Sequence, residues 1–196
     1  MTTDPRTPPV DPEDLAALHT RLARAADANG LLEIAYREID SPVGPLLLAA
    51  TPRGVVRVAF AIEGFDAVLT DLATRLSPRV LLAPNRLEAT AYELDGYFRG
   101  RRTAFDLPLD HALSSGFRAR VQGHLTAIPY GETATYAQVA AALDNPKAIR
   151  AVGSACATNP LPILQPCHRV LRSDGSLGGY LGGLPAKEIL LALEGR

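Results

Sequence analysis

The spacing of apolar residues changes along this chain, and no other feature of the sequence constrains the fold as much. From residue 32 to residue 60, apolar residues alternate or form short runs, separated by the turn sequences Ser41-Pro42-Val43-Gly44-Pro45 and Pro52-Arg53-Gly54. This pattern predicts an antiparallel meander of three strands, near 32–36, 46–50 and 55–60. Beyond residue 115 the apolar spacing is mostly helical. An α/β first half is therefore followed by a mainly helical second half.

Helical spacing also flanks the predicted strands. Leu15, Leu18 and Leu22 form one apolar stripe of a helix that begins at Asp11-Pro12 and ends at Asn29-Gly30. Similar stripes predict two helices after the strands, near 65–76 and 87–98. Residues 101–111 then connect the two halves. We expect three segments, namely a partly disordered N-terminal extension with one helix, an α/β domain and a second domain, at 1–30, 31–110 and 111–196.

Composition excludes several classes of protein. The 196 residues contain no apolar run long enough to cross a membrane and no signal-peptide core. Two cysteines cannot make a disulfide framework, which favours a reducing, cytoplasmic setting, and no Cys/His cluster has zinc spacing. The net charge is −1, yet from Ser115 onward eight Lys/Arg stand against five Asp/Glu. That excess permits a phosphate-binding face without requiring one.

Two short helices are predicted within the second half. Thr135-x-x-Gln138 is a capping-box pattern that opens the first, with Tyr136 on its apolar side. Asp144-Asn145-Pro146 is a tight turn, and Asn145 is the expected N-cap of a second helix from about Pro146 to Thr158. Two helices joined by so short a turn have the geometry of a helix-turn-helix.

The second of these helices has two distinct faces. Ile149, Val152 and Cys156 are expected to be buried, with Cys156 as a structural thiol. The other face carries small residues and one arginine, namely Arg150, Gly153, Ser154 and Ala157. Small residues let a backbone approach DNA closely, and one arginine can enter the base stack, which suits minor-groove binding. From the spacing alone, packing of this face against another part of the protein remains the alternative.

The run Pro166-Cys167-His168-Arg169-Val170 places a thiol directly before an imidazole and a guanidinium. Because the thiolate is the nucleophile and neighbouring positive charge lowers the pKa of a cysteine, Cys167 is a candidate reactive centre. The alternative from the pentapeptide alone is a small buried hydrophobic residue.

Further motifs occur in a definite order along the second half. They are Ile128-Pro129-Tyr130-Gly131-Glu132-Thr133, Tyr136, Asn145–Gly153, Asn159-Pro160, the Pro-Cys-His-Arg-Val run, and Gly182-Gly183-Leu184 with Lys187-Glu188. Together they resemble the O6-alkylguanine-DNA alkyltransferases, or methylated-DNA–protein-cysteine methyltransferases, and the segment 39–46 resembles the N-terminal hairpin of that family. The resemblance covers about residue 32 to the C-terminus. It implies a small ribonuclease-H-like sheet in the first domain and a winged-helix-like arrangement in the second.

The resemblance also implies catalytic roles. Cys167 would accept the alkyl group, His168 would deprotonate it through a water, and Glu194 would orient that histidine, as in a cysteine–histidine–carboxylate triad. Asn159 would brace the turn that carries the cysteine, and the phenol of Tyr136 would protonate the departing guanine. The residues alone leave alternatives open: Glu194 as a solvated last-turn carboxylate, and Tyr136 as a core aromatic.

Binding roles follow from the same resemblance. A base within a duplex cannot reach a buried thiol, so the nucleotide must be flipped out. Arg150 would fill the vacated place in the base stack. The other residues expected to contact the DNA are Tyr136, Gly153, Ser154 and Ala157. The base pocket would be lined by Val170, Tyr180, Gly178 and Pro162. A glycine-rich segment is otherwise just a loop.

The implied function is irreversible, single-turnover transfer of an alkyl group from O6-alkylguanine, and also from O4-alkylthymine, to Cys167. No cofactor, metal or membrane is expected, and the protein is expected to act on double-stranded DNA as a monomer, with cooperative binding on DNA left open. One alternative is a lesion-binding protein without acceptor activity, which the presence of Cys167 disfavours. The other is a cysteine hydrolase without a DNA partner, which the small-faced helix disfavours.

Three positions depart from the family pattern. Gln165 stands where an aliphatic residue is usual, and a buried amide there needs hydrogen-bond partners. Leu181 stands where some members place a polar group near the guanine oxygen. Gln122 stands where tryptophan is common. The first 30 residues match no pattern of the family.

Overall fold

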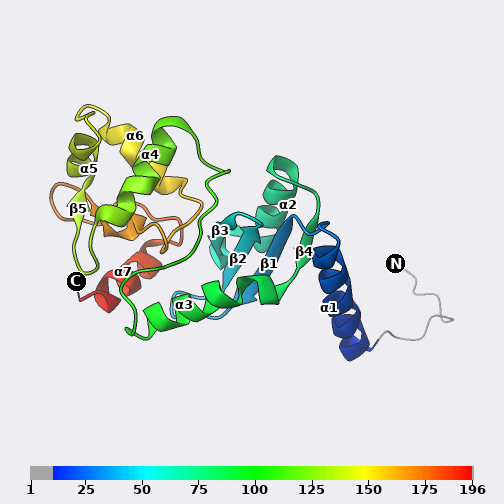
Figure 1. Cartoon of the computed structure of the whole chain (residues 1–196). Helices are drawn as coiled ribbons and strands as arrows, with labels where there is room; N and C mark the ends of the chain where they lie inside the picture. Colours follow the sequence, from blue (N-terminus) through cyan, green and yellow to red (C-terminus); the bar gives the residue numbers. More distant parts are fainter. Residues whose placement is uncertain (1–10, 196) are drawn as a thin grey trace, which may run out of the picture.

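A computed structural model of the protein describes residues 11–195, and the prediction of disorder for residues 1–10 lies outside this range (Figure 1). The predicted meander is confirmed as β1 (Ile34–Ile39), β2 (Leu46–Thr51) and β3 (Gly54–Phe60). A fourth strand, β4 (Val80–Leu82), pairs in parallel with β1, which gives the order β3-β2-β1-β4. The sequence did not predict β4, because three residues are too few to show a period.

Both faces of this sheet are covered. Helix α2 (Phe65–Arg75) packs on one face with Leu47 and Ala49, whereas α3 (Glu88–Phe98) packs on the other with Leu46 and Leu48. Successive side chains of a strand point to opposite faces, so a strand covered on both faces is apolar at every position. Short 3-10 turns, η1 (Ala61–Glu63) and η2 (Pro84–Leu87), lead into these two helices, which fulfil the predictions for 65–76 and 87–98.

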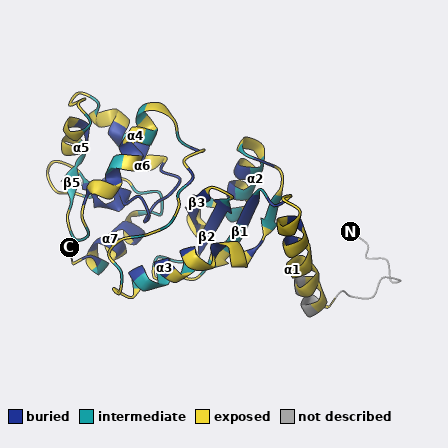
Figure 2. Cartoon of the chain, in the orientation of Figure 1, coloured by how far each residue is buried: buried dark blue, intermediate teal, exposed yellow. Residues whose placement is uncertain are grey.

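The N-terminal helix α1 (Pro12–Ala28) has the predicted limits but not the expected packing (Figure 2). Leu15, Leu18 and Leu22 are 45–53% exposed, and the buried contacts of α1 come from Ala23 and Ala26. The leucine stripe is therefore not the face that packs on the domain. Alanines allow a closer approach of the helix to the strand edge than leucines would.

The C-terminal domain is mainly helical. Its elements are α4 (Gly116–His124), η3 (Leu125–Ala127), β5 (Ala134–Thr135), α5 (Tyr136–Ala142), α6 (Ile149–Ala157), η4 (Cys167–Arg169), β6 (Val170–Leu171) and α7 (Leu184–Leu193). Strands β5 and β6 pair in parallel. The capping box is confirmed: the Gln138 amide donates to Thr135 Oγ1 at 3.1 Å, and the Thr135 amide donates to Gln138 Oε1 at 2.7 Å.

Helix α6 begins later than predicted. The Asn145 carbonyl accepts from the Ala148 amide at 2.9 Å, which closes a separate turn, and the residue before Ile149 has no side-chain cap. The prediction that Asn145 caps this helix is therefore wrong, and the connection between α5 and α6 is six residues long. Ile149, expected to be buried, is 44% exposed in the first turn, while Ala155 is buried with Val152 and Cys156.

Candidate active site

Asn159 organises the turn that leads from α6 to Cys167. Its Nδ2 donates to the Gln165 carbonyl at 2.8 Å, and its Oδ1 accepts from the Leu161 amide at 3.0 Å. It also hydrogen-bonds the Cys167 thiol. One buried amide side chain thus joins both ends of the turn to the thiol.

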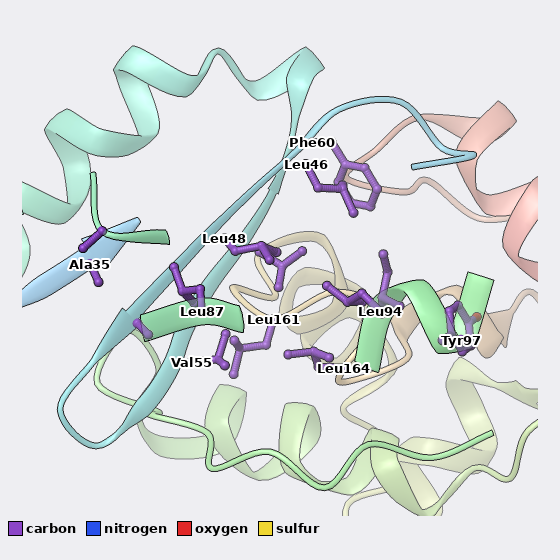
Figure 3. Packing of buried hydrophobic residues seen from close by; sticks show 14 of the residues in the cluster. Ala35, Leu46, Leu48, Val55, Phe60, Leu87, Leu94, Tyr97, Leu161 and Leu164 are labelled. Carbon is purple, nitrogen blue, oxygen red and sulfur yellow. The ribbon is translucent and has the colours of Figure 1, made fainter. Parts of the chain in front are cut away.

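The same turn contains a strained residue. Ile163 has φ 73°, a conformation that a β-branched residue adopts at a cost of about 1–3 kcal/mol. Leu161, Ile163 and Leu164 are inserted into the core of the N-terminal domain, where Figure 3 shows Leu161 and Leu164 close to Leu94. Such strain persists only where the surroundings determine the conformation. The N-terminal domain therefore supports the turn that carries Cys167.

The Cys167 thiol is buried, and burial raises its pKa to about 11, although the Asn159 hydrogen bond and the charge of Lys187 act in the opposite direction. The expectation that adjacent His168 and Arg169 lower this pKa is wrong. The Arg169 guanidinium is directed to Glu194 and to the Ile128 carbonyl. The thiol is therefore protonated at neutral pH, and a base would be required for it to act as a nucleophile.

His168 and Glu194 form a buried pair, with 2.9 Å between His168 Nε2 and Glu194 Oε1. Burial lowers the pKa of His168, against the opposing effect of the Glu194 hydrogen bond, so the imidazole is neutral at neutral pH. A hydrogen bond to a carboxylate assigns the proton to Nε2. Nδ1 has no partner among the described protein groups and keeps a lone pair that can accept a proton.

Glu194 is 6% exposed and is therefore not a solvated last-turn carboxylate. Burial tends to raise its pKa, but hydrogen bonds from His168, Arg169 and Tyr97 outweigh burial and hold the pKa at about 2. Arg169 donates from Nε to Oε2 at 2.8 Å and from Nη2 to Oε1 at 2.9 Å. Because the folded pKa lies below the unfolded value, this stabilisation is full above about pH 4.5 and is lost as pH falls towards 2.

Tyr136 opens helix α5 and is partly buried. Burial, followed by the nearby thiols of Cys156 and Cys167, raises the pKa of Tyr136, so its phenol stays protonated and can donate. A Cβ on Gly178 would lie 2.3 Å from the Tyr136 hydroxyl, so only glycine at this position leaves room for the phenol. The glycine-rich loop, the phenol and Cys167 therefore meet in one place.

The remaining pocket candidates are Tyr180, Val170 and Pro162, and of these Tyr180 packs against His168. Tyr180 packs edge-on against His168, with 6.4 Å between ring centroids, and its buried hydroxyl has no partner among the described groups. Val170 is fully buried, and its carbonyl accepts from Lys187 Nζ at 2.7 Å. Pro162 is buried within the turn that follows Asn159.

The candidate DNA-binding residues lie on the outer face of α6. Arg150, Ser154 and Ala157 are exposed and Gly153 is half-buried. The small-residue face is therefore not covered by another part of residues 11–195, which was the alternative from the sequence. Gly153 also lies beside Tyr136, because a Cβ there would be 4.0 Å from the tyrosine ring.

Three residues of the site were not predicted. Arg169 and Tyr97 both donate to Glu194, and Lys187 is fully buried beside the two thiols. One signal was present in the sequence: Lys187 shares the buried stripe of α7 with Leu190, Leu191 and Glu194 at helical spacing. A charged residue on such a stripe needs a buried partner. No comparable signal marked Tyr97, which has the spacing of a core aromatic.

Two glutamines at the departures from the family pattern behave differently. Gln122 Nε2 donates to the Ala155 carbonyl at 3.0 Å, and its Oε1 accepts from Ser114 Oγ, so its amide is well bonded. Gln165 is 1% exposed, and its Oε1 has no partner among the described protein groups. The hydrogen-bond partner expected for a buried amide is therefore missing at Gln165 Oε1 among the described protein groups.

Replacing Gln165 with methionine is expected to raise the free energy of unfolding by about 1 kcal/mol, because a buried unpaired acceptor is removed at nearly constant volume. Denaturant unfolding measures this change. Gln122→Met is the matched control and should lower stability by about 1–3 kcal/mol, since it breaks bonds that the structure contains. A loss of stability for both variants would show that the Gln165 amide is satisfied by water.

Within residues 11–195, no group of three His, Cys, Asp or Glu side chains is placed to hold a metal ion. In the same part of the chain, no helix is long and apolar enough to cross a membrane.

Comparisons with known proteins agree with this arrangement. Residues 34–111 match the model of the 6-O-methylguanine DNA methyltransferase ribonuclease-like domain, and residues 116–196 match the DNA-binding domain of the same family. Helix α1 precedes both matches.

Full-length relatives give the same result. The methylated-DNA–protein-cysteine methyltransferase of Methanosarcina barkeri is 39% identical over 159 residues, 81% of this chain and 96% of the relative. The crystal structure of the Mycobacterium tuberculosis O6-methylguanine methyltransferase has a TM-score of 0.72 and 37% identity, covering 82% of this chain and 92% of that one. A structure of the M. tuberculosis protein in complex with DNA has a TM-score of 0.71.

The fold and these comparisons together define a DNA methyltransferase of two domains. The chain belongs to the 6-O-methylguanine DNA methyltransferase family, and its enzymatic class is methylated-DNA–protein-cysteine methyltransferase. Its function is the repair of alkylated DNA.

Proposed function

We propose that the protein transfers the alkyl group of O6-alkylguanine in double-stranded DNA irreversibly to the Sγ atom of Cys167, and that O4-alkylthymine is a second substrate. The observation that carries the proposal is the buried hydrogen bond between His168 and Glu194, with the buried Cys167 thiol on the residue before His168 and a protonated phenol near that thiol. Each chain acts once, because a thioether has no route back to the thiol in this site.

His168 supplies the base. Its neutral Nδ1 accepts the thiol proton through a water, while Glu194 holds Nε2–H and stabilises the imidazolium that forms. Asn159 and the ammonium of Lys187 favour the thiolate. As pH falls below the lowered pKa of His168, the imidazole becomes protonated and the base is lost.

The chemical step is a displacement at carbon. The thiolate forms an S–C bond with the alkyl carbon while the bond between that carbon and guanine O6 breaks. Guanine leaves with the electron pair and takes a proton from the Tyr136 phenol, which burial keeps protonated. The adjacent Gly178 leaves space for the phenol. Val170, Tyr180 and Pro162 complete the pocket for the base.

Access to the buried thiol requires that the nucleotide leaves the helix. The exposed face of α6 is small enough to approach a minor groove, and Arg150 is the long cation on it. Tyr136, Gly153, Ser154 and Ala157 are proposed to contact the DNA beside it. The M. tuberculosis relative has been solved with DNA, which supports DNA as the partner. We propose that the protein binds DNA as a monomer.

The Arg150→Ala variant is expected to slow repair of duplex DNA by about tenfold or more, because the flipped state loses the group that replaces the base, while reaction with free O6-benzylguanine is unchanged. Single-turnover rates with both substrates measure this difference. Arg150 is exposed, so the substitution should cost little stability. Arg21→Ala, which removes the same charge from α1, is the control. An equal loss on both substrates would show that Arg150 acts through folding.

The direct test is conversion of O6-methylguanine to guanine in a duplex oligonucleotide, without added cofactor. The amount converted should equal the amount of protein. Binding of the lesion without conversion would favour a lesion-binding protein. Conversion beyond one equivalent would favour a hydrolase and would contradict transfer to the protein.

A further inference from the structure

The catalytic carboxylate is contacted from the other domain. We propose that Tyr97 is a positioning residue for alkyl transfer, whose hydroxyl holds Glu194 in the orientation in which the carboxylate contacts His168. This inference rests on the proposed function. It extends the site to helix α3 of the N-terminal domain.

The contact is short and shared. The Tyr97 hydroxyl donates to Glu194 Oε1 at 2.7 Å, and the same oxygen lies 2.9 Å from His168 Nε2. The other donors that the structure places on this carboxylate come from Arg169 and from the Gly131 amide, both in the C-terminal domain. Tyr97 is therefore the donor that the N-terminal domain contributes to the catalytic pair.

The position of the hydroxyl is set by the core. Tyr97 is fully buried, and its ring packs against Phe98 at 5.4 Å, Phe105 at 5.4 Å and Tyr130 at 6.1 Å between centroids. Figure 3 shows it near the end of α3, along the same core as Leu94. Burial, followed by the charge and hydrogen bond of Glu194, raises the pKa of Tyr97, so the hydroxyl remains a donor throughout the working range.

Glu194 needs such support because of its place in the chain. It follows Leu193, the last residue of α7, and helix ends fray. The last side-chain torsion of glutamate, χ3, which orients the carboxylate, is also soft. A rigid donor from a different domain limits both motions. Since the strained turn at Ile163 is anchored in the same N-terminal core, one domain fixes the thiol-bearing turn and the carboxylate together.

The hydroxyl also withdraws negative charge from the oxygen that faces His168. The charged or titratable groups around His168 and Glu194 are Tyr97, Tyr130, Cys167, Arg169, Tyr180 and Lys187. Removing the Tyr97 hydroxyl leaves more negative charge on Oε1, which stabilises the imidazolium. The pKa of His168 should then rise, and the acidic limb of the transfer reaction should move to higher pH.

The test is the pH profile of single-turnover methyl transfer from saturating duplex DNA by Tyr97→Phe. We expect the maximal rate to fall about tenfold, the midpoint of the acidic limb to rise by roughly half a pH unit, and the affinity for DNA to stay unchanged. Tyr130→Phe is the matched control. Its hydroxyl donates to the Leu193 carbonyl at 2.9 Å, beside Glu194 but not on the carboxylate, so its midpoint should not move.

A second variant tests the direction of the effect. Replacing Tyr97 by 3-fluorotyrosine keeps the ring and makes the hydroxyl a stronger donor, so the midpoint should fall. An unchanged midpoint in both Tyr97 variants would overturn the inference, and so would equal losses of rate in Tyr97→Phe and Tyr130→Phe. Failure of the proposed function is distinguished by the wild-type protein, which would then transfer no methyl group at all.

Discussion

Replacing Cys167 with serine is expected to abolish methyl transfer, with a loss of at least roughly 1,000-fold, equivalent to about 4 kcal/mol of activation free energy. A serine hydroxyl is far less acidic and less nucleophilic than a thiol, and His168 is too weak a base to ionise it in a buried site. Serine is nearly isosteric with cysteine and can keep the hydrogen bond to Asn159, so the fold should be retained. The measurement is the single-turnover rate on a duplex containing O6-methylguanine.

Cys156 provides the control. It is also buried, and burial raises its pKa to about 12, but it lies on the inner face of α6. Cys156→Ala should therefore retain the rate. If Cys167→Ser remained active and Cys156→Ala did not, the acceptor would be assigned to the wrong thiol.

The second large effect is expected for Glu194→Gln. Glutamine keeps the shape but not the charge, so the imidazolium formed at His168 is no longer stabilised, and transfer should slow by about 100- to 1,000-fold. The guanidinium of Arg169, which is 7% exposed, also loses its counter-charge. Breaking such a buried pair should cost about 3–5 kcal/mol of stability. Rates are therefore compared at a temperature at which thermal unfolding shows the variant to be folded.

Glu188→Gln is the matched control for this prediction, because Glu188 lies on the exposed side of the same helix. Both its rate and its stability should stay close to those of the wild type. A Glu194→Gln protein with the wild-type rate would remove the carboxylate from the mechanism.

Much of the fold follows from patterns that are local in sequence. The meander, the capping box of α5 and the limits of α1 depend on residues within a few positions of one another, and the structure confirms them. Strand β4 could not be found in this way, since its pairing with β1 joins residues far apart in the chain. The start of α6 was predicted too early, because Asn145 closes a separate turn and does not cap the helix.

The site shows the same division. The motif residues around Cys167 could be chosen from the sequence, but their electrostatics could not, because burial of the thiol depends on packing around it. The short sequence separation predicted that the charge of Arg169 acts on Cys167, whereas the Arg169 side chain donates to Glu194. Tyr97 reaches the carboxylate across 97 residues. Such a contact exists only once the two domains are packed together.

In the proposed reaction, Cys167 keeps the alkyl group. Protein incubated with excess duplex containing O6-methylguanine is digested, and the masses of the peptides containing Cys156 and Cys167 are measured. We expect the Cys167 peptide to gain one CH₂ unit in every chain and the Cys156 peptide to stay unchanged, with no further repair after one equivalent. An unmodified Cys167 peptide after full repair of the DNA would show that the alkyl group is not transferred to Cys167.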